Sequence, residues 1–174
     1  MGAGGVGGYF GGRFLAAGAD VRFLARGEHL QALQTGGLRV ISPNGPIDLP
    51  RVTASSDPAA IGPVDLVLFT VKLYDTDPAL ELLPPLLGPG TVVVTFQNGV
   101  DSVGLLTRAL GADRAAGGAA YITSVISGPG EITHTAMHRL FFGMPDRRPS
   151  PVLDDLAGLC AKAGVDGTHS PDIW

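Results

Sequence analysis

The sequence of 174 residues has 45% hydrophobic residues and 16% charged residues, which is typical of one globular domain and excludes a disordered chain. Its net charge of −4 is spread along the chain, so no basic patch indicates nucleic acid or a membrane surface as a partner. The longest apolar stretches fall far short of the roughly 18 residues that span a bilayer. The single cysteine, Cys160, excludes an internal disulfide and predicts a buried thiol in a cytoplasmic protein. A small molecule is the expected partner.

The first part of the chain alternates predicted helices and strands. A glycine-rich turn leads into a helix, because apolar residues from Val6 to Phe14 recur at helical spacing and Gly18 ends the run. In chain order, the next predicted elements are a strand at 21–25, a helix at 28–34 and a hairpin made of 38–41 and 47–53.

The rest of the chain predicts a doubly wound α/β fold with a parallel sheet, because buried-strand patterns alternate with helical ones. In chain order, we expect a strand at 64–71, a helix at 77–87, a strand at 91–96, a helix at 101–110, strands between 119 and 144 around the turn Gly128-Pro129-Gly130, and a helix that begins at Ser150 and Pro151.

The opening segment Gly2-Ala3-Gly4-Gly5-Val6-Gly7 matches the pattern G-x-G-x-x-G. In that motif the first glycine permits a tight turn, the second lets the backbone approach a pyrophosphate, and the third lets the helix pack on a strand. The diphosphate of a dinucleotide would lie at the N-terminus of the helix. Glycine is abundant here, with 26 copies, so the alternative is an ordinary loop before a helix. The helix and strand that follow favour dinucleotide binding.

Arg26 stands about 20 residues after the loop, at the end of the next predicted strand. A carboxylate at this place accepts hydrogen bonds from the ribose of NAD and would repel a 2′-phosphate, whereas a guanidinium pairs with phosphate and stacks on adenine. The residue therefore favours NADPH over NADH. A solvated loop arginine is the alternative, and the nearby Glu28 weighs against phosphate binding.

Lys72 and Asn98 fall at the carboxyl ends of two predicted parallel strands, the edge where open α/β sheets bind ligands. Each has an alternative role. Lys72 also fits a solvated lysine, and Asn98 with Gly99 also fits a turn or a helix N-cap.

The four histidines give no indication of a metal site. His134 and His138 lie on a predicted strand, where an offset of four places them on one face but about 13 Å apart, too far to share a metal ion. His29 and His169 are expected at the surface.

The glycine loop, Phe23-Leu24-Ala25-Arg26-Gly27, Val71-Lys72 and Gln97-Asn98-Gly99 occur in an order and spacing that resemble the ketopantoate reductase (2-dehydropantoate 2-reductase) family. The resemblance extends from Gly2 to the last residues. It implies an N-terminal Rossmann domain, a C-terminal helical domain, and reduction of 2-dehydropantoate to (R)-pantoate with NADPH on the route to pantothenate and coenzyme A.

The resemblance also assigns roles to residues. It implies that the glycine loop and Arg26 hold NADPH, that Lys72 lies near the cofactor, and that Asn98 touches both cofactor and substrate. Tyr121 and Thr123 lie in the segment that, in members of the family, approaches the nicotinamide ring of the cofactor. We expect residues 1–170 to form the dinucleotide-binding domain and residues 171–174 to begin the connection to a helical substrate domain that is absent.

Two parts of such an enzyme are expected to be missing. Family members protonate the substrate with a lysine that comes a few residues after a segment resembling Asp172-Ile173-Trp174, so no catalytic residue is expected here, and Lys162 is expected to be solvated. A strand should also precede the glycine loop, and its loss would cost about as much as the 5–15 kcal/mol that stabilise a domain. We therefore expect a misplaced start and a truncated end, and for the chain as given a marginal fold with weak cofactor binding and no turnover.

Two other functions remain open from the sequence. A reductase of another 2-keto acid would share every motif described above, because the residues that select the substrate lie in the second domain. A non-catalytic NADPH-binding module would need no proton donor. A homodimer is expected only for a full-length form.

Overall fold

The computed structural model describes residues 1–99 and 101–173. Its helices are α1 (Gly5–Ala16), α2 (Gly27–Gly36), α3 (Pro58–Ile61), α4 (Thr76–Glu81), α5 (Asp101–Leu110) and α6 (Pro151–Lys162), with short 3₁₀ helices at Leu73–Asp75 and Pro84–Leu86. Its strands are β1 (Arg22–Leu24), β2 (Leu38–Ile41), β3 (Ile47–Leu49), β4 (Thr53–Ser55), β5 (Val64–Phe69), β6 (Leu87–Thr95), β7 (Ala115–Gly128), β8 (Glu131–Gly143) and β9 (Asp166–His169). Among the described residues, no helix has the length and hydropathy needed to cross a bilayer.

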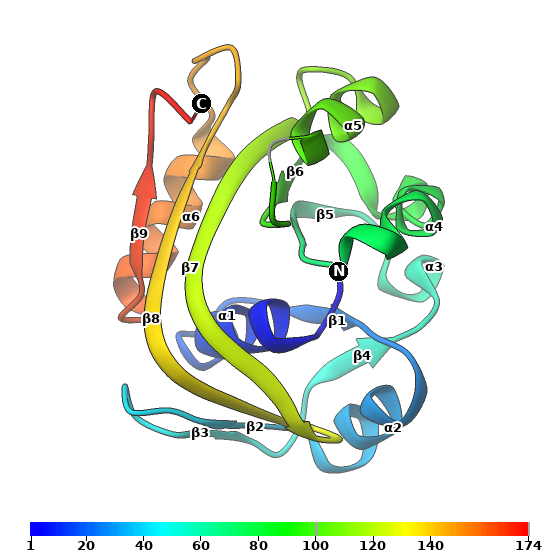
Figure 1. Cartoon of the computed structure of the whole chain (residues 1–174). Helices are drawn as coiled ribbons and strands as arrows, with labels where there is room; N and C mark the ends of the chain where they lie inside the picture. The colour runs from blue at the N-terminus through cyan, green and yellow to red at the C-terminus, as the bar shows by residue number, and fades with distance from the viewer. Residues whose placement is uncertain (100, 174) are drawn as a thin grey trace.

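The strands form two sheets. The larger sheet has the order β3-β2-β8-β7-β6-β5, with β9 beside β8, and β1 pairs with β4 in a smaller sheet. β5, β6 and the start of β7 run parallel, as do β1 and β4, which confirms the predicted α/β fold with a parallel sheet. β7 and β8 form a long antiparallel hairpin that curves around α1 (Figure 1).

The main core lies between α1 and the inner face of this hairpin. Tyr9, Phe10 and Phe14 of α1 are 1–2% exposed and belong to one apolar cluster with Ile132 and Phe142 of β8. Each buried side chain of this size contributes roughly 1.5–3 kcal/mol. The helix lies close to the strands because glycines occupy the contact: a Cβ on Gly8 would come within 3.0 Å of the Ile132 side chain, and one on Gly11 within 2.7 Å of Phe23.

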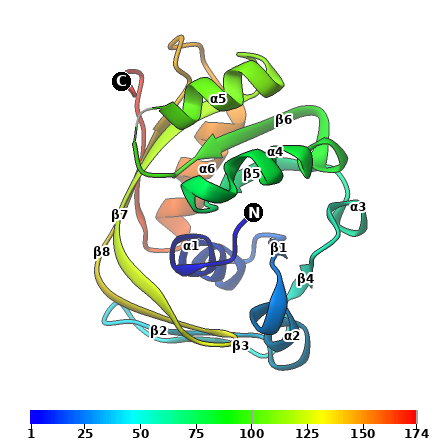
Figure 2. The ribbon, with the colours of Figure 1, turned by 45° about the vertical axis from the view of Figure 1, so that its right-hand side comes forward.

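Met1 and Gly2 join the two sheets. The Met1 amino group donates a hydrogen bond to the Leu68 carbonyl (2.8 Å), Thr70 N–H donates to the Met1 carbonyl (3.0 Å), and Gly2 N–H donates to the Leu24 carbonyl (3.2 Å). Figure 2 shows this segment between β1 and β5 at the start of α1. Met1 and Gly2 thus lie between β1 and β5 and are hydrogen-bonded to residues of both strands or their ends.

A cavity of about 670 Å³ continues from Met1 between the facing edges of β1 and β5. This is the place that the glycine-loop pattern assigns to a preceding strand. Apolar side chains from both sheets, α1 and α6 line the cavity, among them Phe14, Val21, Phe23, Leu66, Leu68, Val152, Leu156 and Leu159.

Two predicted elements are interrupted at a proline. The helix expected at 77–87 ends at Glu81, because Pro84 has no N–H for a helical hydrogen bond and its ring crowds the preceding turn. The strand expected at 47–53 divides into β3 and β4, which join different sheets: Ile47 pairs with Val40 and Thr53 pairs with Arg22. Pro50 lies at the break, where its missing N–H ends the ladder.

Candidate dinucleotide-binding site

Gly2 and Gly7 are glycines because the protein itself leaves no room for a side chain. Gly2 has a φ of 87°, a left-handed conformation that favours glycine, and a Cβ there would lie 2.9 Å from the Val71 nitrogen. A Cβ on Gly7 would overlap the Gly2 carbonyl and the Thr70 hydroxyl. These two positions therefore make the tight turn and the close helix-to-strand approach that the first and third glycines of the motif provide.

Gly4 differs from its neighbours, because a Cβ added to it would meet no atom within 4 Å. A Cβ on Gly5, in contrast, would overlap the Ser124 carbonyl. Gly4 is the N-cap of α1 and no side chain caps the helix there, although the first N–H groups of any helix lack intrahelical partners. The turn thus presents backbone N–H groups beside open space, a suitable site for a phosphate anion.

Arg26 lies two residues after β1, at the N-cap of α2. Its side chain is 79% exposed, and its Nη2 lies 2.8 Å from Oδ2 of Asp75 in an ion pair. Asp75 ends the 3₁₀ helix after β5, so the pair joins the carboxyl ends of β1 and β5. The structure places Arg26 at the expected edge and gives it a partner that sequence reasoning missed.

Lys72 and Asn98 are both exposed, and they follow the adjacent parallel strands β5 and β6. The loops that carry them are tied together by Gln97, which is 7% exposed. Its side-chain amide donates to the Val71 carbonyl (3.0 Å) and to the Thr76 hydroxyl (2.8 Å). The alternative role of Asn98 as a helix cap concerns the junction at Val100, which lies outside the described residues.

β7 brings Thr123 to the glycine loop. The strand pairs with β6 only at its start and then continues beyond the end of β6, so that the Ser124 carbonyl packs on Gly5. Thr123 is exposed next to this contact. Tyr121 is 52% exposed, and its ring lies edge-on to Phe141 at 5.9 Å.

The expectation that His29 is a surface residue is wrong. His29 is partly buried on α2, where its Nδ1 accepts a hydrogen bond from Gly130 N–H (3.1 Å) in the β7–β8 turn. Burial lowers its pKa, and a hydrogen bond with the Ala3 backbone opposes that effect. Through its Nδ1 the side chain connects α2 with the turn of the hairpin.

The distance expected between His134 and His138 is also wrong. Their ring centroids lie 6.3 Å apart, because irregular pairing between β7 and β8 shortens this part of β8 and Met137 adopts a φ of 56°. His134 is buried, with Nδ1 2.9 Å from the Ser42 hydroxyl. His169 is likewise not a free surface residue: it is 17% exposed and pairs with Asp154 at 2.7 Å.

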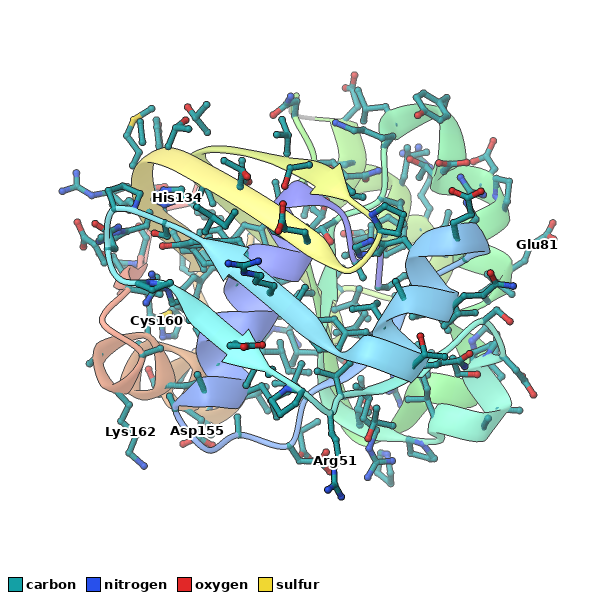
Figure 3. All side chains as sticks on the ribbon, turned by 90° about the horizontal axis from the view of Figure 1, so that it is seen from below. Arg51, Glu81, His134, Asp155, Cys160 and Lys162 are labelled. Atoms are coloured by element: carbon teal, nitrogen blue, oxygen red, sulfur yellow. The ribbon has the colours of Figure 1, made fainter. Side chains whose placement is uncertain are left out.

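Cys160 and Lys162 lie on α6. Cys160 is completely buried, as predicted, and burial raises the pKa of its thiol to about 12. Lys162 is exposed and extends away from the rest of the chain (Figure 3). Neither Cys160 nor Lys162 is therefore part of the candidate site.

Comparisons with known proteins agree on a family. Residues 1–147 match the family described as "Ketopantoate reductase PanE/ApbA". The 2-dehydropantoate 2-reductase of Mesorhizobium japonicum is 33% identical, and the match covers 99% of this chain and 59% of that protein. The uncharacterized oxidoreductase YkpB of Bacillus subtilis is 32% identical, over 100% of this chain and 58% of that protein.

Solved structures give the same result. A crystal structure of 2-dehydropantoate 2-reductase from Geobacter metallireducens matches with a TM-score of 0.93 and 36% identity, over 98% of this chain and 56% of that one. D-mandelate dehydrogenase with NADH and anilino(oxo)acetate has the same fold, with a TM-score of 0.87 and 20% identity, over 99% of this chain and 56% of that one. The chain thus spans somewhat more than half the length of these relatives. It belongs to the ketopantoate reductase family.

Proposed function

We propose that this chain is the NADPH-binding half of a ketopantoate reductase. Residues 1–170 form the dinucleotide-binding domain, and residues 171–174 begin the connection to a helical substrate domain. The reaction is the reduction of 2-dehydropantoate to (R)-pantoate, a cytoplasmic step of pantothenate and coenzyme A biosynthesis. The observation that carries the proposal is the open space at Gly4, beside the backbone N–H groups at the head of α1.

The two charged parts of the cofactor would be held by different elements. Gly2, Ala3, Gly4, Gly5, Val6 and Gly7 form the turn whose backbone N–H groups hold the diphosphate. Arg26 binds the 2′-phosphate, because a guanidinium offers several N–H donors and a permanent positive charge. Its high exposure leaves the side chain free to turn toward this ligand.

The remaining proposed residues lie on the nicotinamide side. When bound, NADPH supplies the hydride for the keto carbon. Asn98 orients the cofactor and the 2-keto acid from the end of β6, Lys72 adds positive charge near the cofactor, and Thr123 borders the nicotinamide from β7. The alkoxide that forms needs a proton from a positioned acid, which we assign to a lysine of the second domain.

The cofactor assignment can be tested by calorimetric titration of the chain with NADPH and with NADH. Arg26→Ala is expected to weaken NADPH binding about tenfold or more and to leave NADH binding nearly unchanged, because only NADPH carries the 2′-phosphate. Arg51→Ala, in an exposed loop, is the matched control. Equal affinities for the two nucleotides, unaffected by Arg26→Ala, would contradict the assignment.

The substrate is tested in a chain that includes the helical domain. Oxidation of NADPH is followed with 2-dehydropantoate and with other 2-keto acids, and the proposal expects 2-dehydropantoate to give the highest kcat/KM. A higher value with another 2-keto acid would reassign the substrate. NADPH binding without turnover of any 2-keto acid would favour a non-catalytic binding module.

A further inference from the structure

The ion pair between Arg26 and Asp75 lies where the cofactor assignment needs a free guanidinium. Nη2 of Arg26 is 2.8 Å from Oδ2 of Asp75. Arg26 follows β1 and Asp75 follows β5, and Gly2 lies between these strands, hydrogen-bonded to Leu24. The pair therefore spans the two sides of the glycine loop.

The backbone that carries Asp75 is held firmly. Asp75 N–H donates to the Lys72 carbonyl (2.9 Å), and the Thr76 hydroxyl donates to the Leu73 carbonyl (2.7 Å) and accepts from Gln97 (2.8 Å). The Asp75 side chain is 24% exposed, against 79% for Arg26. If Arg26 turns toward a phosphate, the carboxylate of Asp75 therefore stays behind at the same edge.

A 2′-phosphate and the Asp75 carboxylate compete for one cation. The carboxylate occupies one N–H donor of Arg26 and offsets its positive charge, so that Arg26 pairs less strongly with a 2′-phosphate. NADH has ribose hydroxyls at this place and experiences neither effect. We infer that Asp75 is a specificity-determining residue that reduces the preference of this site for NADPH over NADH. This inference rests on the proposed function of Arg26.

The test uses Asp75→Asn, which removes the charge and keeps the size and the N-cap preference of the residue. Dissociation constants for NADPH and NADH are measured calorimetrically for the wild-type chain, Asp75→Asn, Arg26→Ala and the double variant. Asp75→Asn is expected to tighten NADPH binding about fivefold, because Arg26 no longer has to give up an exposed ion pair when it binds the phosphate. NADH binding is expected to change less than about twofold. In the Arg26→Ala background the same substitution is expected to have no effect.

Asp77→Asn is the matched control, because Asp77 is exposed in the first turn of α4 without being the partner of Arg26. Asp77→Asn is expected to leave the ratio of the NADPH and NADH dissociation constants unchanged. The inference is overturned if Asp75→Asn leaves this ratio of dissociation constants unchanged. It is also overturned if Asp75→Asn weakens NADPH binding, because Asp75 would then be a residue that orients Arg26 for the phosphate. An equal gain with Asp77→Asn, or a gain that persists without Arg26, also overturns it. Absence of NADPH binding in the wild-type chain refutes the proposed function itself, and the inference with it.

Discussion

The Gln97 side-chain amide donates a hydrogen bond to the Thr76 hydroxyl over 2.8 Å and thereby connects the loops that follow β6 and β5. A second bond from the same amide, to the Val71 carbonyl, fixes the residue before Lys72. Because the next residue after Gln97 is Asn98, one buried side chain sets the spacing of two proposed ligand-binding residues.

Gln97→Leu keeps the volume of the side chain and removes both bonds. The Val71 carbonyl and the Thr76 hydroxyl lose a partner, so the free energy of unfolding is expected to fall by about 1–3 kcal/mol, with weaker NADPH binding. Urea titration and calorimetry measure the two effects. Gln34→Leu is the control, because Gln34 makes one exposed bond to the Ala54 carbonyl. Equally small losses in both variants would show that Gln97 has no special positioning role.

The Met1 amino group predicts a pH dependence of stability. Burial lowers its pKa from 8.0 to about 5, so the folded chain holds this amine neutral over a range in which the unfolded chain binds a proton. The free energy of unfolding is therefore expected to rise between pH 5 and pH 8, by up to roughly 4 kcal/mol, and to gain no more from this group above pH 8.

Acetylation of the Met1 nitrogen isolates this contribution. The acetylated chain keeps an N–H for the Leu68 carbonyl but cannot be protonated, while His29, whose pKa is also lowered by burial, titrates in both forms. The difference in unfolding free energy between the two chains is expected to shrink as the pH rises from 5 to 8. Parallel pH profiles would contradict the assignment.

The cavity between β1 and β5 is expected to accept an added strand. A five-residue extension rich in valine and isoleucine, joined to Met1, would form ladder hydrogen bonds with both edges and bury several apolar side chains at roughly 1.5–3 kcal/mol each. The melting temperature should rise clearly above that of the parent chain. An extension of equal length with a central proline, which cannot complete the ladder, is the control. Identical melting temperatures for the two extensions would rule out strand addition.

Local patterns predicted the elements that position the site. The helical spacing of apolar residues from Val6 to Phe14 identified α1, and the continuous apolar runs identified β5 and β6. This was possible because the spacing of apolar residues within a short segment indicates whether it forms a helix or a buried strand. Even the early end of α4 had a signal, since the pair of prolines at 84–85 is visible in the sequence. The glycine loop could be located for the same reason.

The contacts between distant segments could not be predicted in this way. Arg26 and Asp75 are 49 residues apart, and His29 and Gly130 are 101 residues apart, so each pair depends on how strands are ordered in space. The approach of His134 to a second histidine depends on irregular strand pairing, for which the sequence has no reliable marker. Partners of this kind set the charge and rigidity of the site.

Binding of a diphosphate at the head of α1 is tested most directly by Gly4→Ala, measured both by urea unfolding and by NADPH titration. A methyl group at Gly4 touches no protein atom, so the free energy of unfolding should change by less than about 1 kcal/mol, while NADPH affinity should fall at least about tenfold because the methyl group occupies the diphosphate position. Gly158→Ala, equally open but on α6, should leave the affinity unchanged. A Gly4→Ala chain that binds NADPH as tightly as the wild type would contradict this site.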